Sequence, residues 1–297
     1  MTSELLHLPD GRQAQYWSVG EGPAVFFLHG CPDTRHAAFP GAEAAREVGV
    51  RLIAVNRPGY GQSDAAESDH LTVAHDVAAV ADLLGVERYA VLGMSLGGPY
   101  ALACAALRAE RVRAVGMVAS TANVPELDPP WHRDDLTPEK QDFIRKLARQ
   151  SVDEAIALMR PEFEAFVAQL DPVGAEDEAL AAKWLDGLHP LDQAVLARHE
   201  PAELAAAARE ALTNTAGYLR DAAISFRAWA FRPETISCPT TIWHGIEDSN
   251  ASIRNARWLA SQIPGATLEL RPTAHLSTLH THWPELLVRL KNNYSGR

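Results

Sequence analysis

Cysteine is scarce in this chain. Its 297 residues include three cysteines, Cys31, Cys104 and Cys238, which are odd in number and far apart. Small domains that depend on disulfides usually carry an even set of closely spaced cysteines, so this composition argues against a disulfide framework. We expect three reduced thiols in a cytoplasmic protein.

Positively charged residues are fewer than negatively charged ones. The chain has 27 lysines and arginines against 38 aspartates and glutamates, which gives a formal net charge of -11 at pH 7. Binding to nucleic acid or to an anionic membrane surface needs the opposite balance, so we expect neither partner. The sequence has no long run of like charges, and its acidity therefore indicates solubility.

Long apolar stretches are absent as well. No segment approaches the roughly 18 consecutive apolar residues that predict a membrane-spanning helix. Residues 1–13 lack a positively charged segment followed by an apolar one, so we expect no secretory signal. With 47% hydrophobic residues, the composition suits a globular protein with a large core.

The chain does contain a regular alternation of short apolar runs and helix-like patterns. Residues 4–18 predict two strands around a turn at Asp10-Gly11. Further strands are predicted at 24–30, 51–56, 88–94, 113–120, 240–245 and 266–270. Helices are predicted at 34–48, 71–85, 96–109, 251–263 and 282–291. This order is typical of an α/β fold with a mostly parallel central sheet flanked by helices.

One long stretch interrupts the alternation. Residues 123–213 contain no convincing strand, and their helical segments (138–170, 175–187 and 191–212) are predicted to be broken at Pro161, Pro172 and Pro190. A helical block between two halves of one sheet is best interpreted as an inserted cap. The predicted core therefore comprises 1–122 and 214–297, and the predicted helical cap comprises 123–213.

A serine stands between the strand at 88–94 and the helix at 96–109. A nucleophile that rises above a sheet needs a tight strand-to-helix turn, and the residues two before and two after it must be small. Gly93 and Gly97 meet this requirement around Ser95. The following helix would direct its N-terminal amides toward a developing oxyanion.

A serine nucleophile needs a base and an acid that orients the base. Asp248 follows the strand at 240–245, and His275 follows the strand at 266–270, so both are expected at the same sheet edge as Ser95. The order Ser, Asp, His is the one this architecture uses. Glu247 is the nearest alternative to Asp248 as the acid.

Two backbone amides are expected to form an oxyanion hole. One is the N–H of Leu96, directly after the serine. The other should come from the loop after the strand at 24–30, and since Pro32 has no N–H, the donor is expected to be Cys31. His29 and Gly30 are interpreted as residues that shape this loop.

These segments resemble the α/β-hydrolase fold superfamily, in particular a broad bacterial group of serine hydrolases. The resemblance covers nearly the whole chain apart from the predicted cap. The segments that carry it are HGCPDTR (29–35), RLIAVNRPGYGQSD (51–64), GMSLGGPYALACAA (93–106), WHGIEDSN (243–250) and AHLS (274–277).

Two positions depart from the pattern of this superfamily. Many relatives carry a structural aspartate at the position of Asn56, and a glycine usually precedes the base histidine where this chain has Ala274. The alanine could shift the imidazole. Ser95 also separates the chain from the epoxide hydrolases and haloalkane dehalogenases, whose nucleophile is aspartate.

Three further patterns have simpler explanations. His275, His280 and His282 lie close in sequence, but their spacing does not match a zinc motif, so we expect no metal. Residues 59–63 form a glycine-rich turn without the lysine of a phosphate loop. Aromatic residues near the predicted cap could line an acyl pocket or simply form its core: Trp131, Phe143, Phe163, Phe166, Trp184 and Trp229.

The resemblance and the residues together imply a serine hydrolase for an apolar ester or lactone. Ser95 would attack, His275 would move the proton, Asp248 would orient His275, and the amides of Cys31 and Leu96 would bind the oxyanion. No cofactor is needed, and the protein would be a monomer or homodimer. The same residues would also suit C–C bond hydrolysis, acyl transfer or a lyase-like step, and a non-catalytic ligand-binding protein of this fold is the remaining alternative.

Overall fold

The structure, a computed structural model, describes residues 4–128 and 137–295. Within these ranges, eight strands form one sheet in the order β1-β2-β4-β3-β5-β6-β7-β8. The strands are β1 (Glu4–His7), β2 (Gln13–Val19), β3 (Ala24–Leu28), β4 (Arg51–Val55), β5 (Tyr89–Met94), β6 (Val112–Val118), β7 (Thr240–Gly245) and β8 (Thr267–Arg271). The β1–β2 and β2–β4 pairs are antiparallel and the other pairs are parallel, which confirms the predicted mostly parallel α/β sheet.

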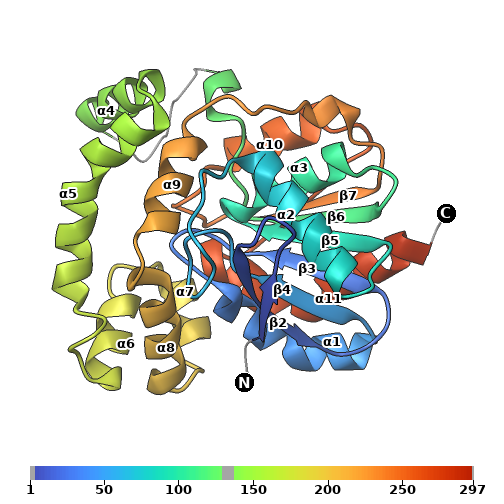
Figure 1. Cartoon of the computed structure of the whole chain (residues 1–297), viewed down its shortest axis with the longest axis horizontal. Coiled ribbons are helices and arrows are strands. Elements are labelled where there is room, and N and C mark those ends of the chain that lie inside the picture. Colours follow the sequence, from blue (N-terminus) through green and yellow to red (C-terminus); the bar gives the residue numbers. More distant parts are fainter. Residues whose placement is uncertain (1–3, 129–136, 296–297) are drawn as a thin grey trace.

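Helices cover both faces of this sheet and also gather at one side of it (Figure 1). The α-helices are α1 (Ala42–Val48), α2 (His70–Leu83), α3 (Gly97–Leu107), α4 (Pro138–Arg149), α5 (Val152–Leu170), α6 (Asp177–Leu185), α7 (Pro190–Leu196), α8 (Pro201–Leu212), α9 (Ala216–Ser225), α10 (Ile253–Gln262) and α11 (His275–Ser295). Short 3-10 helices are η1 (Arg35–Gly41), η2 (Val124–Glu126) and η3 (Pro233–Thr235).

The alternation of side chains along the strands builds a core on each face. In β3, Phe26 and Leu28 point to the cluster that includes α2, α3 and α10, whereas Val25 and Phe27 point to the cluster that includes α1 and α11. All four side chains are almost fully buried. Strands buried on both faces read as continuous apolar runs, which is why the sequence pattern identified them.

The helical stretch between β6 and β7 is divided differently from the prediction. Pro161 does not break a helix, because α5 runs through it from Val152 to Leu170. The break lies at Ser151 instead, whose side chain caps α5 in a reciprocal pair of hydrogen bonds with Glu154. Apolar side chains on both sides of Pro161, including Phe163, pack into one cluster, and this packing offsets the lost backbone hydrogen bond.

Helices α4, α5, α6 and α8 lie together beside the sheet, and α9 runs between them and the core (Figure 1). Their own apolar cluster joins α5, α6, α8 and α9. Among the residues that the structure describes, no helix is both long and apolar enough to cross a membrane.

Candidate active site

Ser95 occupies a strained turn between β5 and α3. Its φ is +52°, a left-handed conformation that costs energy for any residue other than glycine. The turn is held because the Ser95 amide donates to the carbonyl of Val118 at the end of β6, at 2.9 Å. The residue is half-buried.

Close backbone contacts explain the glycines on either side of Ser95. A Cβ on Gly97 would overlap the carbonyl oxygen of Leu28 and lie 2.6 Å from that of His29. A Cβ on Gly93 would lie 2.7 Å from the Cα of Gly98. These contacts are between main chains, so neither can be relieved by a side-chain rotation.

Asp248 and His275 form a direct hydrogen bond. His275 Nδ1 lies 2.8 Å from Asp248 Oδ2, and the Asp248 side chain is buried. An ionised carboxylate can only accept, so His275 Nδ1 is the donor in this bond, and in the neutral ring Nε2 carries the lone pair. His275 is thereby held in the tautomer that a general base requires.

The backbone around Asp248 explains why it, rather than Glu247, meets the histidine. Its Oδ1 accepts hydrogen bonds from the amides of Asn250 and Ala251, at 2.8 and 2.9 Å. Burial raises the pKa of Asp248, but the bond and charge of His275 and the amide of Ala251 outweigh it, and the net pKa lies below the usual value. Glu247 is exposed.

Hydrogen bonds across the strand ends bring these residues to one edge of the sheet. Ser95 is bonded to the end of β6, and the amide of Ala119 donates to Trp243 of β7 at 2.8 Å. Gly245, at the end of β7, packs directly against the main chain of Thr273 and Ala274, next to His275. The segments that hold Ser95, Asp248 and His275 therefore lie at one edge of the sheet, with the end of β6 between the Ser95 turn and the end of β7.

The amides of Cys31 and Leu96 have no hydrogen-bond partner among the residues that the structure describes. Both residues are half-buried, and a Cβ on Gly30 would lie 3.3 Å from Cβ of Ser95, so the Cys31 loop passes close to the serine. The Cys31 side chain lies by Tyr60, with its Sγ 3.2 Å from the hydroxyl. Burial, followed by the charge of Asp221, raises the pKa of this thiol well above its usual value, so it is not a reactive nucleophile.

The histidines near the base have separate partners. His280 lies against the ring of His199, with the centroids 5.7 Å apart. His282 Nδ1 lies 2.9 Å from the carbonyl oxygen of Thr278 and is bonded to it. Within the described parts of the chain, His, Cys, Asp and Glu side chains form no cluster suited to a metal ion.

The aromatic residues near the predicted cap do not share one environment. Phe163 stacks on Tyr218 inside the helical cluster, with centroids 3.7 Å apart. Trp229 is buried in the core of the sheet, Trp184 packs at the edge of the helical cluster, and Phe166 is exposed, as is Phe143. Trp131 lies outside the described residues.

Comparison with known protein families identifies the family of this chain. The alpha/beta hydrolase fold family matches residues 23–279. The chain belongs to this family. The proteins that it matches over most of its length are enzymes, and this chain is an alpha/beta hydrolase enzyme as well.

Two relatives of the chain are named pimeloyl-[acyl-carrier protein] methyl ester esterase. The protein from Chromobacterium violaceum is 29% identical over 270 residues, which cover 89% of this chain and 91% of the relative. The protein from Nitrosomonas europaea is 28% identical over 256 residues, which cover 86% and 89% of the two chains. Among solved structures, an esterase from Exiguobacterium antarcticum superposes with a TM-score of 0.70 over 98% of this chain and 100% of its own, at 22% identity.

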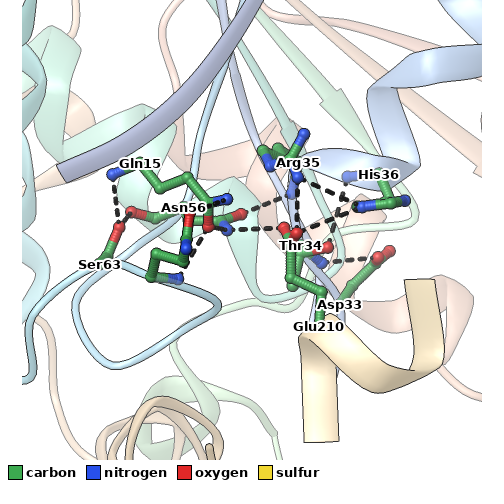
Figure 2. Close-up of polar contacts among 9 residues, drawn as sticks. Gln15, Asp33, Thr34, Arg35, His36, Asn56, Ser63 and Glu210 are labelled. Carbon is green, nitrogen blue, oxygen red and sulfur yellow. Dashed lines mark hydrogen bonds and ion pairs between the residues drawn. The ribbon is translucent and has the colours of Figure 1, made fainter. Parts of the chain in front are cut away.

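The two departures from the usual pattern of alpha/beta hydrolases are accommodated locally. Ala274 is fully buried, and its amide donates to Ser277 Oγ at 2.8 Å, while the next residue still reaches Asp248. Asn56 donates from Nδ2 to Glu210 Oε1 and to Gln15 Oε1, both at 2.8 Å (Figure 2). An aspartate has no such donor, so the amide suits the carboxylate that α8 places beside it.

Sequence reasoning missed three polar residues that hold the loops of this site. Arg57 donates to the carbonyls of His29 and Gly30. Asp192 of α7 accepts from the amide of Ser277 at 2.7 Å, at the N-terminus of α11. Asp221 pairs with Arg57. Arg57 lies within the segment 51–64 that carries the family resemblance, but Asp192 and Asp221 had no local signal, because their partners are far away in the chain.

Proposed function

We propose that this alpha/beta hydrolase is a serine hydrolase that cleaves a carboxylic ester or lactone through an acyl-enzyme on Ser95. The observation that carries the proposal is the hydrogen bond between His275 and the buried Asp248. It leaves a basic imidazole nitrogen at the sheet edge where Ser95 stands on its strained turn. The amides of Cys31 and Leu96, which have no partner within residues 4–128 and 137–295, support the same assignment, since an oxyanion needs two such donors.

The reaction follows from these positions. The Ser95 hydroxyl attacks the substrate carbonyl as His275 Nε2 takes its proton, and the negative oxygen of the tetrahedral intermediate accepts hydrogen bonds from Cys31 and Leu96. His275 then returns the proton to the leaving alcohol as the ester bond breaks. Water repeats the sequence on the acyl-enzyme, which releases the acid and restores Ser95. Asp248 stabilises the imidazolium throughout, and the cycle needs neither cofactor nor metal.

The substrate class is supported by the two relatives named methyl ester esterases, which this chain matches over most of both lengths. We therefore expect a medium-sized, apolar acyl group joined to a small alcohol. A panel of esters from acetate to octanoate, with simple lactones beside it, would test this. Turnover confined to acetyl esters would contradict the expected acyl group.

Helices within 123–213 are proposed to form a cap over this site. Two of their side chains reach loops that follow strands of the sheet at the edge that holds Ser95. Glu210 of α8 pairs with Arg35 after β3, and Asp192 of α7 bonds Ser277 after β8. A cover at this edge would exclude water from the acyl-enzyme and select the acyl group.

The decisive experiment is the intact mass of the protein after incubation with a fluorophosphonate. A single adduct on the wild type, absent from the Ser95→Ala variant, is expected, because the reagent labels only an activated serine. A Ser261→Ala variant, which removes an exposed serine hydroxyl on α10, serves as the matched control and should label like the wild type. If the folded wild type forms no adduct, the esterase proposal is wrong, and C–C bond cleavage or simple ligand binding on this fold becomes the better assignment.

A further inference from the structure

A buried arginine lies beneath the loop that carries Cys31. The side chain of Arg57 is 1% exposed. Its Nη1 donates to the carbonyl of His29, and its Nη2 donates to the carbonyl of Gly30 at 2.8 Å. Its own amide donates to His29 Nε2 at 3.2 Å. One residue therefore makes three bonds to two consecutive residues of the loop.

The same contacts determine the tautomer and the charge of His29. Because Nε2 accepts from the amide of Arg57, the proton of the ring sits on Nδ1, which lies 2.8 Å from the carbonyl of Gly30 and donates to it. Burial, and then the charge of Arg57, lower the pKa of His29 well below its usual value, so the ring is neutral. The carbonyl of Gly30 thus receives two hydrogen bonds.

The charge of Arg57 is balanced from helix α9. Asp221, which is also buried, accepts from Nε at 3.0 Å and from Nη2 at 2.6 Å, both through Oδ2. The hydroxyl of Tyr100 donates to Oδ1 at 2.6 Å, and that of Tyr60 donates to Oδ2 at 2.8 Å. With both oxygens occupied, the carboxylate holds the planar guanidinium in one orientation.

We propose that Arg57 is a positioning residue for the oxyanion hole, and that Asp221 of α9 holds it in place. In a trans peptide, the C=O and N–H groups point in opposite directions. Two bonds to the carbonyl of Gly30 therefore set the direction of the next amide, that of Cys31. The inference rests on the proposed function, since it gives the loop amide an oxyanion to bind.

This arrangement needs the planar guanidinium group of an arginine, which has several donors in a fixed geometry. A lysine keeps the positive charge opposite Asp221 but is a single compact donor, so it cannot reach both loop carbonyls and the carboxylate in a fixed plane. Arg57→Lys therefore tests orientation without leaving a buried charge unpaired. Losing the carboxylate would be a poorer test, because an unpaired buried charge destabilises the whole fold.

The experiment compares the wild type with Arg57→Lys in ester hydrolysis and in the rate of Ser95 phosphonylation. A donor removed from an oxyanion hole lowers turnover by roughly 10²–10³, so a misdirected donor should lower kcat and the phosphonylation rate by about 10- to 100-fold. KM should stay within about threefold, and the pH dependence of kcat/KM should be unchanged because Asp248 and His275 are untouched. Arg12→Lys is the matched control, because Arg12 is also an arginine paired with an aspartate, Asp76, but it bonds neither His29 nor Gly30.

The outcomes of this experiment distinguish a failure of the positioning role of Arg57 from a failure of the proposed function. If the wild type labels on Ser95 but Arg57→Lys retains full kcat, the positioning role of Arg57 is wrong and the proposed function stands. If the wild type does not label, both are wrong. If Arg57→Lys does not fold, Tyr100→Phe replaces it, because this change loosens Asp221 and leaves the ion pair intact. A several-fold loss of kcat at constant KM is then expected, and unchanged kcat would overturn the inference.

Discussion

Replacing Glu210 with glutamine tests how strongly helix α8 is held to the sheet. Glu210 accepts a hydrogen bond from Arg35 Nη2 at 2.6 Å and from Asn56 Nδ2 at 2.8 Å, and His36 Nε2 lies 3.3 Å away (Figure 2). Arg35 is itself buried, and its Nε and Nη1 have no partner among the described residues. Glu210→Gln removes a negative charge that this guanidinium faces.

The size of the effect follows from the pKa of Glu210. Burial alone would raise it, but the hydrogen bonds from His36 and Asn56, together with the charges of His36 and then Arg35, lower the pKa from 4.5 to about 2. At about 1.4 kcal/mol per pKa unit, this difference corresponds to about 3 kcal/mol in favour of the ionised folded state. The side chain is 14% exposed, and solvent screening reduces the expected loss to about 2 kcal/mol at pH 7.

The sign of the pH dependence is fixed by the lowered pKa. The contribution of Glu210 is complete above 4.5, where the carboxylate is ionised in both folded and unfolded chains. Between 4.5 and about 2, the unfolded chain binds the proton first, so the contribution falls by about 1.4 kcal/mol per pH unit. The gap in unfolding free energy between wild type and Glu210→Gln should therefore narrow as the pH drops through this range.

Urea unfolding at pH 7 and at pH 3.5 measures this gap. We expect about 2 kcal/mol at pH 7 and less than about 1 kcal/mol at pH 3.5. Glu203→Gln on the same helix is the control, because this side chain is 60% exposed and its ion pair with His199 lies at the surface, so its change should stay within about 0.5 kcal/mol. If the difference in unfolding free energy between wild type and Glu210→Gln is equal at both pH values, or absent at pH 7, the ionised Glu210 does not stabilise the fold as argued.

Three further changes probe the site and its supports. Gly97→Ala places a Cβ against the main-chain carbonyls of Leu28, at the end of β3, and His29. We therefore expect phosphonylation at least about 100-fold slower and a lower melting temperature, which labelling kinetics and thermal unfolding would measure. Asn56→Asp removes the amide donor to Glu210 and sets two carboxylates together; a loss of about 2 kcal/mol in urea unfolding at pH 7 is expected, and Glu210→Gln in the same chain should restore part of it. Asp248→Asn should lower kcat by about 10⁴ while the fold persists, whereas Glu247→Gln should leave initial rates within about twofold; similar rates for the two variants would show that the acid has been misassigned.

The order of strands and helices could be predicted from the sequence because it depends on neighbours in the chain. Runs such as 24–28 and 89–94 are apolar on every residue, as strands buried on both faces must be, and glycines at 93 and 97 mark the turn around Ser95. The rule that proline ends a helix was wrong at Pro161. Tertiary packing lets α5 continue through this residue.

The polar contacts that support the site could not be predicted this way. Arg57 and Asp221 are 164 positions apart, and Asn56 and Glu210 are 154 apart, so no local pattern links either pair. The sequence predicted Asp248 as the partner of His275, with Glu247 as the nearest alternative, and the structure shows which of the two carboxylates the loop turns inward.

Backbone preferences and apolar periodicity act over a few residues, and they determined the strands, most helices and the turn that presents Ser95, whereas the passage of α5 through Pro161 depends on tertiary packing. The partners of buried charges were decided by tertiary structure. A charge removed from water must be matched wherever the fold happens to bring an opposite group, however distant in sequence. For this protein, that requirement joins Arg57 under the Cys31 loop to Asp221 on α9, and Asn56 to Glu210 on α8.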